Sequence, residues 1–179
     1  MSIFLKTLIR DVPDYPVKGI MFKDITTLLK DATGFKFTIN EFVSRYRGME
    51  IDKVAGIESR GFIFGAALAF ELGIGFIPIR KKGKLPAETV GHDYELEYGK
   101  DRIEIHLDAI TNGEKVLLVD DLIATGGTAG AAIKLIEKMG GIIVESCFVV
   151  DLPFLGGSSS IENSGHKIFS LCEYGNEHE

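Results

Sequence analysis

One segment constrains the fold of this chain more than any other, because it joins a buried strand to a glycine-rich loop and a helix. Val116–Val119 is apolar at every position, Asp120 and Asp121 follow it, and residues 125–128 read Thr-Gly-Gly-Thr. Apolar residues then recur at helical spacing over residues 131–139. A strand that is apolar throughout is buried on both faces, as in a parallel sheet that helices cover. The segment therefore predicts a β–α unit of an α/β protein.

The same alternation of strand and helix is found elsewhere in the chain. Short apolar strands are expected at Val54–Ile57, Ile74–Ile79 and Ile142–Val150, and an apolar helix at Phe62–Leu72, which Gly73 ends. Strands that alternate with helices favour an open, mostly parallel sheet with helices on both faces. The predicted fold class is α/β.

Three further segments have clear periodicity. Residues 4–9 and 35–46 carry apolar side chains at helical spacing, so each predicts a helix. Residues 94–107 instead alternate apolar and polar side chains around Gly99-Lys100-Asp101. This alternation predicts an antiparallel hairpin with one solvent-facing side, which is expected to stand off the parallel sheet.

Length and composition favour one folded domain. The chain has 179 residues, of which 45% are hydrophobic and 26% charged, and no repeat or linker divides it. A single domain over residues 1–179 is therefore expected. Cys147 and Cys172 form no metal or disulfide pattern, and the N-terminal sequence does not resemble a secretion signal. Both features indicate a cytoplasmic protein.

Charge and hydropathy exclude several kinds of partner. The chain has 20 Lys+Arg against 26 Asp+Glu, a net charge of −6, which repels phosphate backbones and anionic lipids, so no nucleic-acid partner is expected. No apolar segment approaches the ~20 residues that span a bilayer, so no membrane partner is expected either. The 4 histidines show no metal-ligand spacing, and no metal site built by the chain alone is predicted.

The loop after the strand at 116–119 suits a phosphorylated ribose. Gly126 and Gly127 allow the backbone to approach an anion closely, and Thr125 and Thr128 add hydroxyl donors at the start of a helix, where N–H groups are free. Two adjacent carboxylates suit a diol or a nearby cation such as magnesium. The alternative is an ordinary loop before an N-capped helix. The segment lacks the Gly-Lys-Ser/Thr of a P-loop and the G-x-G-x-x-G of a dinucleotide site.

VLLVDDLIATGGT at 116–128 resembles the signature of the type I phosphoribosyltransferases, which bind phosphoribosyl pyrophosphate. Three other segments are similar to the adenine phosphoribosyltransferases within that group: VPDYPVKGIMFKDIT at 12–26, AGIESRGFIFGAALA at 55–69, and IRKKGKLPAETV with YELEYG within 79–99. The resemblance covers residues 9–150 and is weaker from Asp151 to His166. It implies a type I phosphoribosyltransferase fold with a lid hairpin and a small N-terminal hood. It also implies a purine-salvage transferase that converts adenine and phosphoribosyl pyrophosphate to AMP and pyrophosphate.

The resemblance assigns the binding of phosphoribosyl pyrophosphate to residues in three of these segments. These are Ser59, Arg60, Arg80, Lys81, Lys84, Asp120, Asp121, Ala124, Thr125, Gly126, Gly127 and Thr128. Arg60 and the basic residues are implied to hold the pyrophosphate, and some of them to reach across a dimer interface. The resemblance further implies a cis peptide bond between Glu58 and Ser59. The alternatives are a surface arginine at 60 and a solvated basic loop at 80–84.

The base and the chemical step are also assigned by resemblance. Phe22 is implied to stack on adenine, while backbone groups of Met21 and Lys23 pair with its edge; the alternative is that Phe22 belongs to the core. Glu97 in the hairpin is implied to handle the proton of the purine ring. Glu95 shares its face in a strand, and both glutamates could instead face solvent.

The resemblance implies a homodimer and a magnesium ion bound mainly through the phosphoribosyl pyrophosphate. Two other functions stay open. One is a phosphoribosyltransferase for another base, and the other is a non-catalytic regulator that senses phosphoribosyl pyrophosphate. The acidic charge, the absence of an added N-terminal DNA-binding segment and the presence of Glu97 argue against the regulator.

Overall fold

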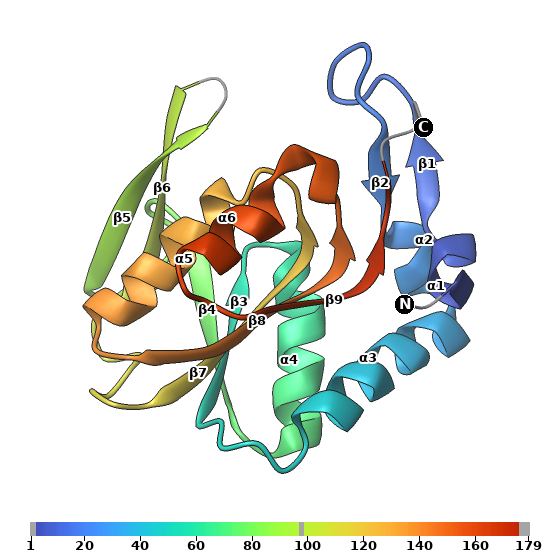
Figure 1. The fold of residues 1–179 in the computed structure, drawn as a ribbon. Helices are drawn as coiled ribbons and strands as arrows, with labels where there is room; N and C mark the ends of the chain where they lie inside the picture. The colour runs from blue at the N-terminus through green and yellow to red at the C-terminus, as the bar shows by residue number, and fades with distance from the viewer. Residues whose placement is uncertain (1–2, 97–98, 176–179) are drawn as a thin grey trace.

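A central sheet organises the computed structural model, which describes residues 3–96 and 99–175 (Figure 1). Within these residues seven strands form the sheet in the order β5-β6-β4-β3-β7-β8-β9. The parallel strands are β3 (Lys53–Ile57), β4 (Gly75–Lys81), β7 (Lys115–Ile123), β8 (Ile142–Asp151) and β9 (Ile168–Glu173). The antiparallel edge consists of β5 (Thr89–Leu96) and β6 (Gly99–His106).

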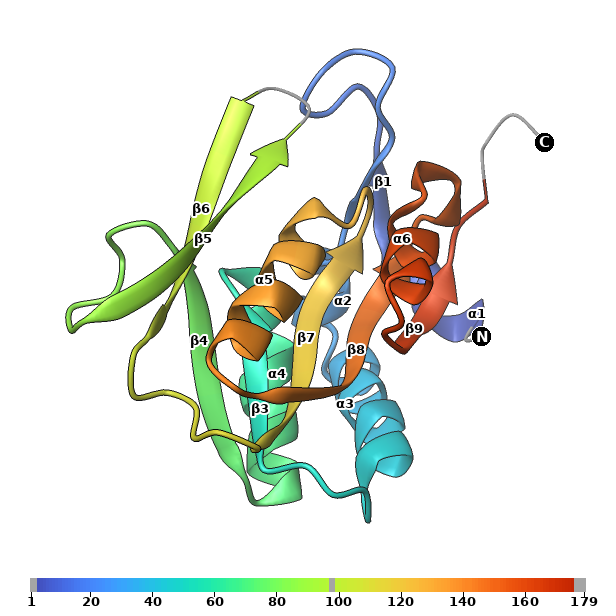
Figure 2. The same ribbon diagram turned by 60° about the vertical axis from the view of Figure 1, so that its left-hand side comes forward.

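Helices cover both faces of the sheet, as the apolar strands predict. In β7, Leu117 and Val119 face one apolar cluster, while Val116 and Leu118 face another. The first cluster includes residues of α3 (Ala32–Tyr46) and α4 (Arg60–Leu72), and the second includes residues of α5 (Gly127–Lys138). These helices lie on opposite sides of the strands in Figure 2. The α/β prediction is confirmed.

Short elements at both chain ends complete the structure. The N-terminal hood consists of α1 (Ile3–Leu8), β1 (Arg10–Val12), β2 (Phe22–Asp24) and α2 (Thr26–Lys30). Near the C-terminus, η1 (Pro153–Leu155) and α6 (Gly157–Asn163) lie between β8 and β9. None of the helices described here is both long and apolar enough to cross a membrane.

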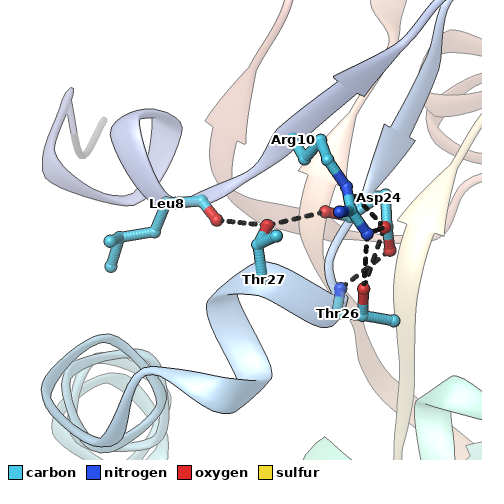
Figure 3. A network of polar contacts seen from close by, with 5 residues as sticks. All are labelled: Leu8, Arg10, Asp24, Thr26 and Thr27. Carbon is cyan, nitrogen blue, oxygen red and sulfur yellow. Dashed lines mark hydrogen bonds and ion pairs between the residues drawn. The ribbon is translucent and has the colours of Figure 1, made fainter.

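A carboxylate holds the hood together (Figure 3). Asp24 accepts hydrogen bonds from the Arg10 guanidinium at 2.5 Å and from the backbone N–H and hydroxyl of Thr26 at 2.9 and 2.8 Å. The hydroxyl of Thr27 donates to the carbonyl of Leu8 at 2.6 Å. Burial acts to raise the pKa of Asp24, but the Arg10 and Thr26 bonds outweigh it and lower that pKa to about 2. These bonds tie β2 to β1 and to the start of α2.

The hairpin forms, but the prediction of its position was wrong in three respects. β5 ends at Leu96 and β6 begins at Gly99, so Gly99-Lys100-Asp101 lies in a strand and not in the turn. β6 also pairs with β4, which makes the hairpin part of the sheet, although its far end extends beyond the other strands (Figure 2). Finally, Glu104 is buried on the side expected to face solvent, because Gly83 and Arg102 donate to its carboxylate.

Candidate active site

A cavity of about 300 Å³ opens at the carboxyl ends of two neighbouring parallel strands, β3 and β7. β3 leads through α4 to β4 on one side, whereas β7 leads through α5 to β8 on the other side. The connections therefore diverge between β3 and β7. In open α/β sheets this divergence creates a crevice in which ligands bind.

The predicted phosphate loop forms one wall of this cavity. Ala124, Thr125, Gly126, Gly127 and Thr128 all line it. Gly126 has a φ of 81°, which favours glycine, and α5 begins at the next residue. The first N–H groups of a helix lack partners within the helix, so the start of α5 can offer donors to an anion in the cavity.

The segment after Asp151, whose role the sequence left open, supports the phosphate loop. The backbone N–H of Gly157 donates to the carbonyl of Ala124 at 3.0 Å. A Cβ at Gly157 would lie 2.3 Å from that carbonyl oxygen and 2.6 Å from the backbone nitrogen of Gly126. Glycine at 157 therefore permits this close packing. The Gly-Gly dipeptide was visible in the sequence, but its contact with a loop about thirty residues earlier depends on tertiary structure.

The aspartate pair lies on β7, as predicted, but the strand continues beyond the pair to Ile123. The two carboxylates differ in their surroundings. Asp121 is only 3% exposed and accepts a hydrogen bond from Arg60 Nε at 2.5 Å. Burial and then the charge of Asp121 raise the pKa of Asp120. Both residues line the cavity.

Arg60 and Ser59 form another part of the cavity wall. Both line the cavity, and α4 begins at Arg60, two residues before the predicted start at Phe62. Arg60 is therefore a partner of the acidic pair and not an isolated surface arginine. The peptide bond between Glu58 and Ser59 is cis, as the resemblance implies.

Two of the predicted basic residues, Arg80 and Lys81 at the end of β4, are ion-paired and not merely solvated. Lys81 lines the cavity, and its ammonium lies 2.8 Å from Asp101 Oδ2. Arg80 and Lys84 do not line it. The Arg80 guanidinium instead contacts the Glu58 carboxylate at 3.0 Å and donates to the carbonyl of Lys84 at 2.9 Å. The structure thus brings one of the three predicted basic residues into the cavity.

The residues predicted to bind the base lie in and beside β2, outside the cavity lining. Phe22 is partly exposed, so it does not belong to the core, and the Arg60 guanidinium lies 5.7 Å from the centre of its ring. Lys23 is buried, with its ammonium 2.7 Å from Asp11 and 4.2 Å from the centre of the Tyr174 ring. The Lys23 side chain therefore ties β2 to β1 and to the C-terminal segment.

Several residues that line the cavity were not predicted, among them two polar residues of the hairpin. Tyr94 of β5 and Asp101 of β6 line the cavity, where they are cross-strand partners. Sequence alternation places Tyr94 on one face of the strand, but no signal shows that this face meets the phosphate loop. Asp101 was not recognised as a cavity residue because the predicted turn included it. Glu97 lies outside the described residues, and the side chain of Glu95 is not described either.

Among the residues that the structure describes, no group of three or more His, Cys, Asp or Glu side chains could hold a metal ion. The acidic pair can offer carboxylate oxygens to an ion that a substrate also ligates. Magnesium is commonly bound in this way, through one or two carboxylates together with phosphate oxygens.

The comparisons agree with this geometry. The sequence matches the phosphoribosyl transferase domain family over residues 26–170, so the chain is a phosphoribosyltransferase. This match continues past Asp151, where the resemblance in the sequence was weakest. The adenine phosphoribosyltransferase of Nitrosospira multiformis is 65% identical over 170 residues, which cover 95% of this chain and 97% of the relative.

Similar solved structures indicate which family within this class the chain belongs to. The crystal structure of adenine phosphoribosyltransferase from Thermoanaerobacter pseudethanolicus is similar with a TM-score of 0.91 and 50% identity, covering 95% of this chain and 98% of that one. The Saccharomyces cerevisiae enzyme gives a TM-score of 0.87 and 40% identity, covering 94% and 96%. Within its class, the chain belongs to the adenine phosphoribosyltransferase family.

Proposed function

We propose that this chain transfers the phosphoribosyl group of phosphoribosyl pyrophosphate to adenine, giving AMP and pyrophosphate in purine salvage. The observation that carries the proposal is the cavity between β3 and β7. A phosphate loop, two cations (Arg60 and Lys81) and the acidic pair all line this one cavity. This arrangement suits a sugar with a phosphate at one end and a pyrophosphate at the other.

Each part of the cavity has a proposed role in holding the substrate. Residues 124–128 bind the 5-phosphate through backbone N–H groups and two hydroxyls. Asp120 and Asp121 accept hydrogen bonds from the ribose hydroxyls. Ser59, Arg60 and Lys81 hold the pyrophosphate, and their fixed charges stabilise it as it leaves the anomeric carbon.

Arg80 and Lys84 have the same proposed role but need a rearrangement. Arg80 is held by Glu58, and the Arg80–Glu58 bonds would have to break before its guanidinium could reach a pyrophosphate. Hydrogen bonding from Arg80 lowers the pKa of Glu58, so this carboxylate stays charged and competes for Arg80 at neutral pH.

Magnesium is the proposed cofactor, bound mainly through the oxygen atoms of the phosphoribosyl pyrophosphate. It would neutralise part of the charge on the leaving pyrophosphate. In the chain, Asp120 is the better candidate ligand, because Asp121 is already paired with Arg60.

The base is proposed to bind beside Phe22. Phe22 would stack on adenine while the carbonyl and N–H groups of Met21 and Lys23 pair with its edge. A 6-oxopurine presents the opposite donors and acceptors and would leave buried groups unpaired, at a cost of ~1–3 kcal/mol each. The related Saccharomyces cerevisiae structure contains adenine together with an imino-altritol bisphosphate, which supports a site for both components.

Glu97 is the proposed catalytic residue. As the purine nitrogen bonds to the anomeric carbon and the bond to pyrophosphate breaks, the ring gains positive charge, and a carboxylate there can take the ring proton. The test compares Glu97→Gln with Glu95→Gln for turnover and for substrate affinity. A large fall in kcat for Glu97→Gln alone, with affinity preserved, supports the role, whereas equal losses in both variants refute it.

A cytoplasmic homodimer is proposed as the form of the protein. Ile63 and Phe70 lie two turns apart on α4 and are 41% and 83% exposed, an apolar face that a second copy could cover. Cys147 and Cys172 are buried free thiols, in keeping with a reducing compartment. Residues 1–179 are proposed to act as one domain, because both apolar clusters pack on the same sheet.

The decisive experiment offers phosphoribosyl pyrophosphate and magnesium with each of six bases and measures pyrophosphate release. We expect kcat/KM for adenine to exceed that for hypoxanthine and guanine by ~100-fold or more. Comparable rates for a 6-oxopurine would indicate a transferase for another base. Tight binding of phosphoribosyl pyrophosphate, with no pyrophosphate released in the presence of any of the six bases, would indicate a sensor.

A further inference from the structure

The hairpin carries a carboxylate that contacts a cation of the cavity. Asp101 Oδ2 lies 2.8 Å from the Lys81 ammonium, and its Oδ1 accepts a hydrogen bond from the backbone N–H of Arg102 at 2.8 Å. The hydrogen bond from Lys81 lowers the pKa of Asp101, and the same bond raises the pKa of Lys81. Both groups are therefore charged at neutral pH.

Asp101 also connects Lys81 to the phosphate loop, through Tyr94. The Thr128 hydroxyl donates to the Tyr94 hydroxyl oxygen at 3.4 Å, and the Tyr94 hydroxyl donates to Asp101 Oδ2 at 3.2 Å. A continuous series of side chains thus runs from the phosphate loop, through the hairpin, to Lys81. It joins the proposed 5-phosphate site to the proposed pyrophosphate site.

Two other cations near the cavity, Arg60 and Arg80, are paired with carboxylates outside the hairpin. Asp121 belongs to β7 and Glu58 directly follows β3, so both of these carboxylates belong to the central parallel strands. Asp101 belongs to the hairpin. Loss of its contact with Lys81 would change how the hairpin is held, whereas loss of the other pairs would not.

We propose that Asp101 is a positioning residue that holds Lys81 in the substrate-free site and gives it up to the pyrophosphate. The inference rests on the proposed function. A pyrophosphate has more negative charge and more acceptor oxygens than one carboxylate, so it wins the competition for Lys81. The uncompensated Asp101 then repels the bound polyanion. Asp101 therefore weakens substrate binding while it keeps the hairpin joined to the phosphate loop in the absence of substrate.

The test is Asp101→Asn, which removes the charge and keeps an oxygen that can accept from the Arg102 N–H. Calorimetry with phosphoribosyl pyrophosphate and magnesium, without adenine, should show Kd falling roughly two- to fivefold, the range expected for an exposed ion pair. KM for phosphoribosyl pyrophosphate should fall with it, while KM for adenine stays unchanged. A purely structural role would not produce this split.

Asp93→Asn is the matched control. It makes the same change in charge on the same hairpin, but Asp93 pairs with Arg102, at 3.1 Å, and its loss should leave Kd unchanged. In a Lys81→Gln background, Asp101→Asn should have a smaller effect than in the wild type, because the pair is already broken. This second comparison sets the change in Kd caused by Asp101→Asn in the wild type against the change it causes in the Lys81→Gln background. It therefore does not depend on how much Lys81→Gln itself weakens binding.

Three results would overturn the proposal: equal effects of Asp101→Asn and Asp93→Asn, weaker binding by Asp101→Asn, or an undiminished effect in the Lys81→Gln background. Each of them leaves the proposed function intact if the wild-type protein binds phosphoribosyl pyrophosphate. A wild-type protein that binds none refutes the proposed function, and the inference with it.

Discussion

At the scale of single residues, the cavity combines groups that favour binding with groups that weaken the fold. Asp120 is a group that weakens the fold, since burial and the neighbouring Asp121 raise its pKa. A carboxyl whose pKa is raised by folding destabilises the folded protein when it is ionised. That penalty is complete above the raised pKa and disappears as the pH falls toward the value of an unfolded aspartate.

Asp120→Asn should therefore make the protein more stable at pH 7 and bind substrate more weakly. The gain in Tm should shrink as the pH is lowered through the raised pKa. The affinity for phosphoribosyl pyrophosphate should fall roughly tenfold, because a neutral acceptor bonds the ribose hydroxyls less strongly than a charged one. Thermal unfolding between pH 4 and 8 and calorimetry are the measurements. Asp108→Asn, at an exposed position, is the control, and a lower Tm for Asp120→Asn at pH 7 would contradict the argument.

Gly157 provides a second prediction at this scale. Gly157→Ala places a Cβ 2.3 Å from the Ala124 carbonyl oxygen, so the phosphate loop or α6 must move. We expect a loss of ~1–3 kcal/mol in the free energy of unfolding, typical of overpacking, and a higher KM for phosphoribosyl pyrophosphate. Gly130→Ala is the control, since its Cβ would have only an ordinary contact, 3.7 Å from Ile161. Urea unfolding and steady-state kinetics test both, and identical behaviour of the two variants would show that the packing at Gly157 is unimportant.

The same scale shows what sequence reasoning could predict about the cavity. The acidic pair and the phosphate loop follow one another along the chain in one short motif, so local sequence is enough to place them together. Arg60 lies 61 residues before Asp121 and meets it because β3 and β7 are neighbouring parallel strands. Tyr94 and Asp101 meet only through the register of the hairpin, which depends on where the turn falls. Because the predicted turn included Asp101, its pairing with Tyr94 was not predicted.

At the scale of elements, the strands and helices of the central sheet were predicted with errors mainly at their ends. Apolar strands and helices have strong periodicity, but their limits depend on contacts with neighbouring elements. β7 continues through two aspartates because it pairs with β8 up to Asp151. α6 and β9 were not predicted, since α6 contains several small polar residues and lacks an apolar stripe.

The hood offers a pH-dependent prediction for an element. The pKa of Asp24 is lowered to about 2, so its bonds to Arg10 and Thr26 stabilise the hood above the unfolded pKa of about 3.8. That contribution is lost as the pH falls through about 2. Asp24→Asn should therefore lower the free energy of unfolding at pH 7, by an amount that decreases steadily below pH 4. Urea unfolding at several pH values measures it.

Glu41→Gln, at an exposed position on α3, is the control for this effect. It should leave the free energy of unfolding nearly unchanged at every pH. A deficit for Asp24→Asn that is constant from pH 7 to pH 5 and then shrinks toward pH 2 supports a pKa near 2, whereas a deficit that is already absent at pH 5, or one that does not shrink below pH 4, would contradict it.

At the scale of the whole molecule, α4 exposes an apolar face that no other part of the described chain covers. Phe70 is 83% exposed, and Ile63 lies on the same face of the helix. If a second copy covers this face, Phe70→Glu buries an unpaired charge in the interface, which is strongly unfavourable. We expect sedimentation velocity to show a dimer for the wild-type protein and a monomer for Phe70→Glu at micromolar concentration.

Leu107→Glu is the control, because Leu107 is 54% exposed after β6, away from α4, and its replacement should leave the dimer intact. The same variants test whether the basic loop acts across the interface. If Lys84 or Arg80 reaches the pyrophosphate of the partner's site, monomeric Phe70→Glu should have a raised KM for phosphoribosyl pyrophosphate, while its far-ultraviolet circular dichroism stays that of the wild type. A dimeric Phe70→Glu protein would exclude this face as the interface, and a fully active monomer would place the basic loop in the site of its own subunit.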